Sequence, residues 1–545
     1  MTVPGAIPRG EVRSGEIRRP AENGRTIFDY ADDLAVRMPA SCERSGRCHE
    51  CVVEIVEGVE ALSIPTEAED FLRPPYRLAC QCIIERDDSA IDFRPLRRRL
   101  RILTESGDDD VAIDSPVRRA AGRVTYEGED VDIDRGAAYG LAIDIGTTTV
   151  VVELVDLETG TVASVIALEN PQRFGGSDVM NRISYDEKTP GELRRALVHA
   201  LNPEIRAACR DIGIDRRVIY EAMIVGNSTM RDLFFGIDVA TIGQMPYKSK
   251  TELAALAGER AGTEVIVRAH SVGLWMHPQG RVVGGPLIAS HLGADIAADL
   301  VAIGADELAG TWMLVDVGTN TEVIVHSAGR TLGASCPAGP AFEGGLVRYG
   351  MAGSDGAIER AYLDGERWRL ETIGGAPALG MCGSGLIDVL AELLRHDRMT
   401  AFGVFRDRAG EVEIEPDRGI TLSRDDASNL AQAKAANACG QIILLRQLGL
   451  HPTDVDRVYL AGGFANHIDV GNAIEIGFLA PIPGDRVSKI GNASIRGARR
   501  LLLSVARRTA LRALIARIEH VELETTPDFF ELFVEGCQFK PLQIA

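Results

Sequence analysis

The chain has 545 residues, of which 45% are hydrophobic and 25% are charged. At about 150 residues per domain this length predicts three or four domains, and the composition excludes intrinsic disorder, a collagen-like repeat and a small disulfide-stabilised fold. The 59 basic and 79 acidic residues give a net charge of −20, which supplies no overall attraction to nucleic acid or to an anionic membrane.

The first twenty residues are polar and carry no apolar stretch of the kind that a secretory signal needs. No run of about 18 uncharged apolar residues follows, so we expect no membrane span and a cytoplasmic protein. Ten cysteines in such a protein point to metal ligands or buried thiols rather than disulfides.

Changes in composition divide the chain into five parts. We expect a polar tail over residues 1–20, a compact domain over 21–96 and a linker over 97–137, where a basic run is followed by an acidic one. From residue 138, apolar strands alternate with Ala- and Leu-rich helical stretches, which favours α/β structure. Because LAIDIGTTTVVVELVDLETG at 141–160 is echoed by LVDVGTNTEVIVHSAGR at 314–330, we predict a duplicated lobe, with one lobe over 138–265 and the other over 266–545.

Half of the cysteines lie between residues 42 and 82. Cys42, Cys48 and Cys51 stand on one short loop, and 28 residues separate Cys51 from Cys80. Three thiolates on a loop plus one distant thiolate form the plant-type [2Fe–2S] ferredoxin arrangement, here with one extra residue in the first gap. Gly46 permits a strained loop between them. The spacing therefore predicts a cluster that transfers single electrons.

Two alternatives remain open for this metal site. Cys82 would share a face with Cys80 if both stood on a strand, and could replace it as a ligand, although a small buried hydrophobic role is the simpler interpretation. Structural zinc is the other alternative, but it usually takes two Cys-x2-Cys pairs, and only one is present here.

Two similar turns follow apolar strands in the α/β part of the chain, after residue 138. Each has the form Asp-x-Gly-Thr, beginning at Asp144 and Asp316. Backbone N–H groups and hydroxyls in such turns surround phosphate, and the aspartate can hold hydrated Mg²⁺. A third segment, LAGGFAN at 460–466, has adjacent glycines that let the backbone approach a base or ribose. The candidate phosphate, Mg²⁺ and nucleoside contacts are Asp144, Gly146, Thr147, Thr148, Asp316, Gly318, Thr319, Asn320, Gly462 and Gly463.

Other segments fit the same cleft, although each alone is commonly a structural turn. Asp295 is a candidate for orienting water, and Asp316 and Glu322 provide further acidic chemistry. The Gly-rich stretch around Gly339 and Glu343 could cover phosphates. The remaining candidates are Asn227 and Ser228 after a strand, and Gly383 and Ser384 at the start of a helix, where an anion can bind.

The paired turns resemble those of the actin-like ATPase superfamily. Together with the ferredoxin-like module, the chain resembles the reductive activators of corrinoid-dependent enzymes over nearly its whole length after residue 20. The segments that carry the resemblance are RLACQ, LAIDIGTTTVVVELVD, NPQRFGGSDVMNRI, VGNSTM, VDVGTNTE, AGPAFEGG, MCGSGLIDVL and LAGGFANHID. One departure is clear: the family usually has Gly-Gly after the first cysteine and Gly after the second, where this chain has Glu43-Arg44 and His49.

The resemblance implies a multidomain α+β and α/β protein: a β-grasp [2Fe–2S] ferredoxin, a linker and a two-lobed, RNase H-like ATPase. It implies Cys42, Cys48, Cys51 and Cys80 as cluster ligands, with ATP and Mg²⁺ as further cofactors. The implied activity is ATP-dependent transfer of one electron to the inactive Co(II) form of a methyltransferase corrinoid protein, regenerating Co(I). The implied partners are that corrinoid protein and an upstream electron donor, and a homodimer is left open.

Three rival interpretations have to be tested. The first is an ATP-dependent iron–sulfur activator of another enzyme, such as a radical dehydratase, although such activators lack a ferredoxin domain. The second is a nucleotide-binding redox sensor without turnover, against which the acidic residues of both turns argue. The third is a small-molecule kinase, for which an attached electron carrier has no evident use.

Overall fold

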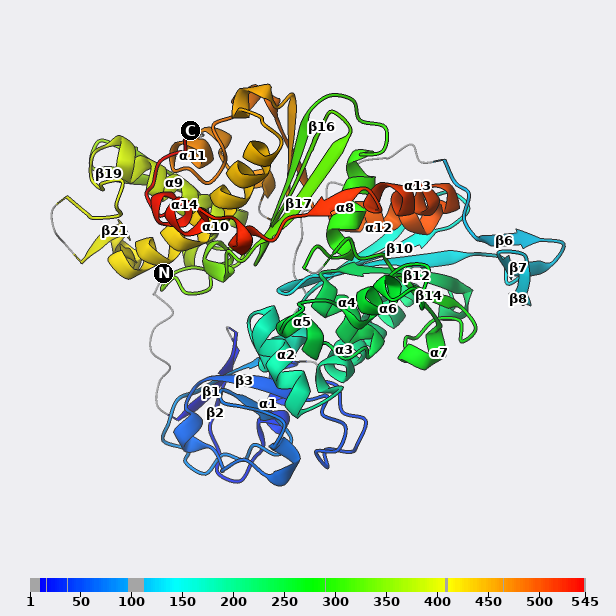
Figure 1. Ribbon diagram of the computed structural model, residues 1–545. Helices are drawn as coiled ribbons and strands as arrows, with labels where there is room; N and C mark the ends of the chain where they lie inside the picture. Colours follow the sequence, from blue (N-terminus) through cyan, green and yellow to red (C-terminus); the bar gives the residue numbers. More distant parts are fainter. Residues whose placement is uncertain are drawn as a thin grey trace.

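The computed structural model describes residues 10–15, 17–36, 38–96, 112–289, 291–406, 410–463 and 465–543. An N-terminal domain projects from a larger body made of two lobes, at the bottom of the view, and a small β-sheet extends from that body to the right (Figure 1). Within these described ranges, no helix combines the length and apolar character needed to cross a membrane. The fold is a mixture of α+β and α/β domains, as the sequence predicts.

The N-terminal domain is a five-stranded sheet with strand order β2-β1-β5-β3-β4, against which helix α1 packs. Its elements are β1 (Glu11–Ser14), β2 (Ile17–Pro20), α1 (Ile27–Asp33), β3 (Val52–Glu57), β4 (Tyr76–Leu78) and β5 (Ile91–Pro95). Thr26 begins α1 with a capping box that it completes with Asp29. The helix buries Ile27, Phe28, Tyr30 and Ala31, which form the core beneath the sheet.

The polar tail that we predicted over residues 1–20 is wrong for residues 11–14 and 17–20, which are strands of this sheet. Strand β1 pairs in parallel with β5 through Val12, and β2 pairs with β1 as an exposed edge. Only Val12 of these strands is buried, so their sequence carries little hydrophobic alternation. Residues 1–9 lie outside the described part of the chain.

The predicted linker over 97–137 also contains folded structure. Strands β6 (Val117–Ala120), β7 (Arg123–Tyr126) and β8 (Glu129–Ile133) form an antiparallel sheet. Tight turns with positive φ at residues 121–122 and 127–128 connect them. Tyr126 is buried and its hydroxyl donates to Oε1 of Glu221 at 2.9 Å, which fixes the sheet to the first lobe. Residues 97–111, with most of the basic run and the whole acidic run, are not described.

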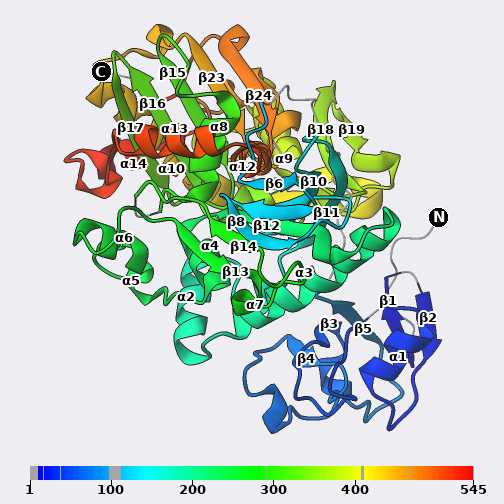
Figure 2. The same cartoon turned by 90° about the vertical axis from the view of Figure 1, so that its right-hand side faces the viewer.

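The first lobe has a six-stranded sheet with the order β11-β10-β9-β12-β14-β13. Helices α2, α3 and α4 lie on one side of it, α8 contacts β12, and the distant α12 (Ala493–Leu503) contacts β9 and β12 (Figures 1 and 2). The elements are β9 (Tyr139–Ile145), β10 (Thr149–Asp156), β11 (Val162–Glu169), α2 (Val179–Lys188), α3 (Glu192–Asp211), β12 (Ile219–Gly226), α4 (Ser228–Phe235), α5 (Ala240–Gly243), α6 (Lys250–Leu256), β13 (Val265–Arg268), α7 (Ala269–Val272), β14 (Arg281–Gly284) and α8 (Ala294–Ile303).

The second lobe repeats this sheet with the order β24-β23-β15-β16-β17-β25 and adds two smaller sheets. Its main elements are β15 (Trp312–Val317), β16 (Thr321–Ser327), β17 (Arg330–Cys336), α9 (Gly383–Arg395), α10 (Arg424–Gln447), β23 (Arg457–Ala461), α11 (Val470–Glu475), β24 (Val487–Gly491), α12 (Ala493–Leu503), α13 (Val505–Ile515), β25 (Ile518–His520) and α14 (Phe529–Gly536). The smaller sheets contain β18 (Ala357–Asp364), β19 (Arg367–Thr372), β20 (Gly380–Met381), β21 (Glu411–Glu415) and β22 (Ile420–Ser423).

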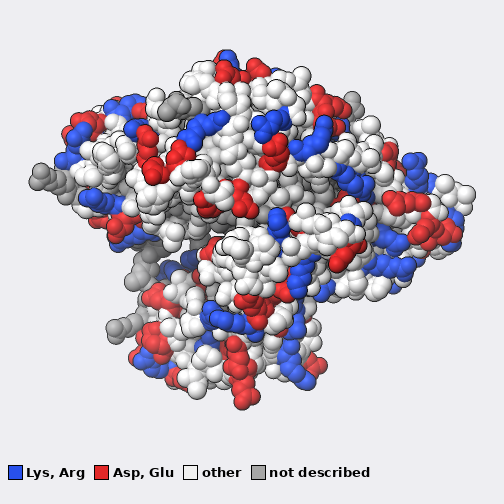
Figure 3. Space-filling model, in the orientation of Figure 1, with Lys and Arg blue, Asp and Glu red and all other residues white. Residues whose placement is uncertain are grey.

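The duplication read from the sequence is present in the topology. In each lobe three antiparallel strands are extended by a parallel strand: β12 pairs with β9, and β23 pairs with β15. The predicted lobe boundary at 265/266 is wrong, because it falls inside β13, which together with β14 completes the first sheet. Acidic and basic side chains are interspersed over the visible face (Figure 3).

Candidate functional site: a paired cysteine loop and two phosphate turns

The four expected cluster cysteines come together as two pairs. Hydrogen bonding links the thiols of Cys42 and Cys48, and likewise those of Cys51 and Cys80. Among the described residues, no three His, Cys, Asp or Glu side chains are grouped as ligands of a single ion. Two thiol pairs beside one another match a cluster of two irons, in which each iron takes two thiolates.

Negative charge is favoured on one sulfur of each pair: the pKa values of Cys42 and Cys80 are lowered, whereas burial raises that of Cys48, and the Cys80 thiol and burial raise that of Cys51. Burial raises the pKa of Cys42, but hydrogen bonds from the Cys48 thiol, backbone N–H groups and Ser45 outweigh it and lower the pKa well below its usual value. The thiol of Cys51 is the main cause of a similar lowering of the pKa at Cys80. The Gln81 amide also approaches the Cys80 sulfur, with Nε2 at 3.4 Å. These donors would stabilise thiolates and tune the potential of a bound cluster.

Cys82 occupies a different environment from these four. Its side chain is fully buried in the domain core. Burial raises the pKa of its thiol to about 12, and the charged groups that act on it are Arg77 and Glu69 rather than another cysteine. Its surroundings therefore favour the small hydrophobic role over the ligand role.

Gly46 lets the cysteine loop pass close to its neighbours. The residue has φ +81°, and a Cβ atom there would lie 2.9 Å from Cβ of Ala68 and 3.2 Å from Cδ of Gln81. We predict that Gly46→Ala destabilises the loop by about 1–2 kcal/mol, since the left-handed conformation is unfavourable and Gln81 is displaced. Iron retention per chain during dialysis against a chelator measures the effect, and wild-type retention would contradict the prediction.

Three non-glycine residues of this loop also have positive φ: Glu43 at 53°, Arg44 at 65° and His49 at 60°. These are the positions at which the sequence departs from the glycines of the family that it resembles. Arg44 binds Asp29 at 2.8 Å and lies 4.2 Å above the Phe28 ring, so it closes the loop on its own domain. His49 instead reaches the first lobe, with Nδ1 2.9 Å from Oε2 of Glu192.

The two Asp-x-Gly-Thr turns, which we call the phosphate turns because we expect them to bind phosphate, face each other across the lobes. Thr147 and Thr148 lie between β9 and β10, and Thr319 lies between β15 and β16. The Glu343 carboxylate accepts from the Thr148 hydroxyl at 3.1 Å and also from the Thr319 hydroxyl. Asn227 caps α4 and donates to the Thr147 hydroxyl at 3.0 Å. The structure therefore brings both turns, Asn227 and Glu343 into one site.

A group of carboxylates lies at the same place. Burial raises the pKa of Asp144 to about 7, and the charge of Asp316 adds to the shift. Burial and then the charges of Asp316 and Asp144 raise the pKa of Asp295. The pKa values of Asp316 and Glu322 are raised as well, chiefly by burial. Buried carboxylates that disfavour one another's ionisation would be stabilised by a cation, and Mg²⁺ usually takes one or two carboxylates together with phosphate and water.

Four further residues at this site were not predicted from the sequence: Asp299, Asn492, Asn170 and Arg182. Asp299 is one helical turn after Asp295, is fully buried, accepts from Ser494 at 3.0 Å and leaves Oδ2 without a partner in the described structure. Asn492 donates to Asp144 at 3.3 Å. Asn170 and Arg182 bind the backbone of the first turn. The i, i+4 spacing from Asp295 was a usable signal for Asp299.

The remaining candidates have mixed placements. Gly146 and Gly318 lie within the two turns, with Asn320 beside Gly318. A Cβ atom at Gly462 would lie 2.1 Å from the Val317 carbonyl oxygen, whereas Gly463 faces open space. Ser384 is fully buried and its nearest polar partner is the Cys382 thiol, at 3.4 Å, so its packing is internal. The other candidates are Ser228, buried at the start of α4, Gly383, at the start of α9, and Gly339, in the loop before Glu343.

Known families match three consecutive parts of the chain. Residues 11–85 match the 2Fe-2S iron-sulfur cluster binding domain, residues 139–308 match the RACo middle region, and residues 310–544 match the C-terminal ASKHA domain of RACo. The first match covers four of the five strands of the N-terminal sheet, all but β5, and the other two matches cover the two lobes. The N-terminal unit is therefore a ferredoxin-type domain.

Individual relatives extend over most of the chain. The corrinoid activation enzyme RamQ of Eubacterium limosum is 31% identical, with 74% of this chain and 70% of that protein covered. The [Co(II) methylated amine-specific corrinoid protein] reductase of Methanosarcina barkeri is 23% identical, with 73% and 76% covered. A solved reductive activator for corrinoid, iron-sulfur protein superposes with a TM-score of 0.69 at 26% identity, over 98% of this chain and 99% of that one. The chain belongs to the family of reductive activators of corrinoid proteins.

Proposed function

We propose that this protein is an ATP-dependent reductive activator that transfers one electron to an inactive Co(II) corrinoid protein of a methyltransferase system. The observation that carries the proposal is the presence, in one chain, of a ferredoxin domain with paired thiols and of two Asp-x-Gly-Thr turns that face each other and are bridged by Glu343. The named functions of the two relatives, corrinoid activation and corrinoid protein reduction, support it.

Each half of the protein has a distinct chemical task. We propose Cys42 and Cys48 as ligands of one iron and Cys51 and Cys80 as ligands of the other, an assignment that follows the observed thiol pairs. A bound [2Fe–2S] cluster supplies one-electron chemistry. All ten cysteines are free thiols, which suits a reducing compartment, so we propose that the protein acts in the cytoplasm.

The second task is nucleotide binding and turnover. Thr147, Thr148 and Thr319, with the backbone N–H groups of their turns, would bind the phosphates of ATP. Asp144 and Asp316 would hold Mg²⁺, while Asp295 and Glu322 would orient the attacking water. Moving one charge uphill by 100 mV takes about 2.3 kcal/mol, and ATP is a suitable source. A nucleotide-driven change requires that the ATP and ADP states bind the Co(II) and Co(I) partners with different affinity.

The raised carboxyl pKa values predict how Mg²⁺–nucleotide binding depends on pH. Asp144, with its pKa raised to about 7, keeps a proton near neutral pH, and a cation must displace that proton. Affinity for Mg²⁺–nucleotide should therefore rise by roughly tenfold between pH 6 and pH 8. Titration calorimetry in buffers of different ionisation enthalpy measures both the affinity and the proton release.

The same raised carboxyl pKa values affect the stability of the nucleotide-free protein in the opposite sense: it should decrease with rising pH, whereas nucleotide affinity should increase. The native protein without nucleotide binds more protons than the unfolded chain between about pH 4 and pH 8, so its stability should fall as pH rises through that window. Affinity that does not change over pH 6–8 would show that these carboxylates do not bind the cation.

ATP turnover distinguishes the proposal from its rivals. We expect hydrolysis to accelerate when a Co(II) corrinoid protein from the same organism is added and to remain slow with the Co(I) form. A sensor without turnover would show no hydrolysis in either case. Stoichiometric transfer of the γ-phosphate to a small molecule would instead identify a kinase and contradict the proposal.

A further inference from the structure

One segment, which we call the connecting segment (residues 170–185), binds the first phosphate turn. It begins after β11 and includes a 3-10 turn (Pro171–Gly175) and most of α2. Asn170 donates its side-chain Nδ2 to the Gly146 carbonyl at 2.8 Å, and its backbone N–H to the Thr148 carbonyl at 2.7 Å. Arg182 donates to the carbonyl of Thr147 at 2.7 Å. The backbone of the turn is thus held at each of its three residues by this segment.

Arg182 has an unusual environment for an arginine. Its side chain is 1% exposed, and no described residue forms an ion pair with it, although the charges of Asp178 and Glu343 act on it from farther away. Its direct partners are the Thr147 and Gly176 carbonyls and the Met230 sulfur. A buried cation is stabilised by negative charge nearby, and phosphates bound at the adjacent turn would add to the charges already acting on Arg182.

The same segment binds the ferredoxin domain at its other side. The Phe174 ring meets the Phe71 ring edge-on with centroids 6.2 Å apart, and the Tyr185 ring lies 5.4 Å from Phe174. The Tyr185 hydroxyl donates to the Phe71 carbonyl. Arg173 pairs with Glu54 at 3.3 Å. Buried hydrophobic residues of the ferredoxin domain and of the first lobe form one continuous cluster, so this contact is a packed interface.

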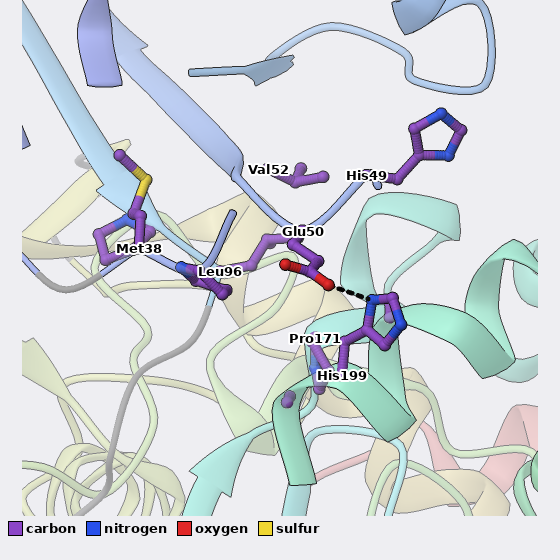
Figure 4. Close-up of a pocket in the computed structure, with 11 residues that line it drawn as sticks. Met38, His49, Glu50, Val52, Leu96, Pro171 and His199 are labelled. Carbon is purple, nitrogen blue, oxygen red and sulfur yellow. Dashed lines mark ion pairs between the residues drawn. The ribbon is translucent and has the colours of Figure 1, made fainter. Parts of the chain in front are cut away.

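Phe71 in turn contacts the cysteine loop. The His49 ring stacks on it with centroids 4.0 Å apart, directly after Cys48 in the chain. His49 also binds Glu192 of α3, and Glu50 pairs with His199 of α3 at 3.5 Å across a pocket between the two domains (Figure 4). The contacts therefore run without a gap from the phosphate turn to the residues beside the expected cluster ligands.

We propose that the connecting segment couples the nucleotide bound at the first phosphate turn to the position of the ferredoxin domain, with Arg182 acting at the turn and Phe174 and Tyr185 acting at Phe71. The inference rests on the proposed function, because it requires that ATP binds at this turn. Phosphate charge beside Thr147 would attract the Arg182 guanidinium and shift α2. The Phe71 contact, and with it the cysteine loop, would then respond to the nucleotide.

Hydrogen–deuterium exchange of the full-length protein with its cluster tests the coupling. The probe is a non-hydrolysable ATP analogue with Mg²⁺. In the wild type we expect the exchange rate to fall at residues 144–149. At residues 69–78 we expect the exchange rate to change by about fivefold or more, which is near the lower end of the coupling usual between two sites. Tyr185→Phe, which removes only the hydroxyl that binds Phe71, and Phe174→Leu should keep the slowing at 144–149 but lose most of the response at 69–78.

Tyr220→Phe is the matched control. Tyr220 is a buried tyrosine of the same lobe whose hydroxyl donates to Asp132 at 3.2 Å, away from the ferredoxin domain, so this variant should respond like the wild type. Slowing at 144–149 without any change at 69–78 in the wild type would overturn the coupling and leave the proposed function intact. An undiminished response in both variants at Phe71 would also overturn it. No slowing at 144–149 would refute the nucleotide site itself.

Discussion

Cys80→Ala is expected to remove the iron–sulfur cluster and leave nucleotide binding unchanged. Cys80 is the distant member of the four thiols and pairs with Cys51, so its loss leaves one iron with a single thiolate. We expect the visible absorbance of the cluster, its iron and its sulfide to fall to background, together with all corrinoid reduction. Absorbance, metal analysis and EPR of the reduced protein measure the loss.

Cys82→Ala is the matched control for this experiment. Cys82 is two residues away and fully buried, and the charged groups acting on it are Arg77 and Glu69. The variant should keep its cluster and lose about 1 kcal/mol of stability, the usual cost of a small change in a core. A cluster that survives in Cys80→Ala but disappears in Cys82→Ala would reverse the ligand assignment.

Asp316→Asn is expected to have the opposite effect to Cys80→Ala. Asp316 is the penultimate residue of β15, just before the second phosphate turn, and its charge raises the pKa of both Asp144 and Asp295. The substitution keeps the shape of the side chain but removes a charge that would hold Mg²⁺. ATP hydrolysis should fall by roughly 10²–10³-fold, the loss typical of one electrostatic contact in a transition state, while the cluster spectrum stays that of the wild type.

Asp397→Asn provides the comparison within the same lobe. Asp397 is exposed, and its ion pair with Arg406 lies on the surface, so this variant should hydrolyse ATP at the wild-type rate. Full activity in Asp316→Asn would exclude the second turn as the magnesium site and would leave Asp144 and Asp295 to be tested.

The candidate site could be predicted in large part because its chemistry depends on local patterns. The cysteine spacing identifies the ferredoxin loop, because three of the four thiolates stand on one short loop and the fourth follows farther along the chain. The two Asp-x-Gly-Thr turns could be recognised because each follows a buried strand, which also gave the duplicated lobe. Such patterns can be recognised in a sequence because neighbouring residues of the turn itself provide the ligands.

Other features were beyond sequence reasoning because long-range contacts create them. Strands β1 and β2 are largely polar: β1 is held by pairing with β5, about 80 residues away in the chain, and the exposed β2 is held by pairing with β1. Asn492 reaches Asp144 from the start of α12, across 348 positions of sequence. Arg182 is a basic residue on an ordinary helix until the fold places its guanidinium against the Thr147 carbonyl. No local periodicity reports contacts of this kind.

The central claim is that ATP drives an electron from this protein to a corrinoid partner. The most direct test mixes the anaerobically reduced protein with a Co(II) corrinoid protein from the same organism, with and without ATP, and follows cobalt and iron–sulfur signals by absorbance and EPR. The account predicts that Co(I) forms only with ATP, as the reduced [2Fe–2S] signal disappears. A reducible cluster that yields no Co(I) with ATP, across the corrinoid proteins of that organism, would contradict it.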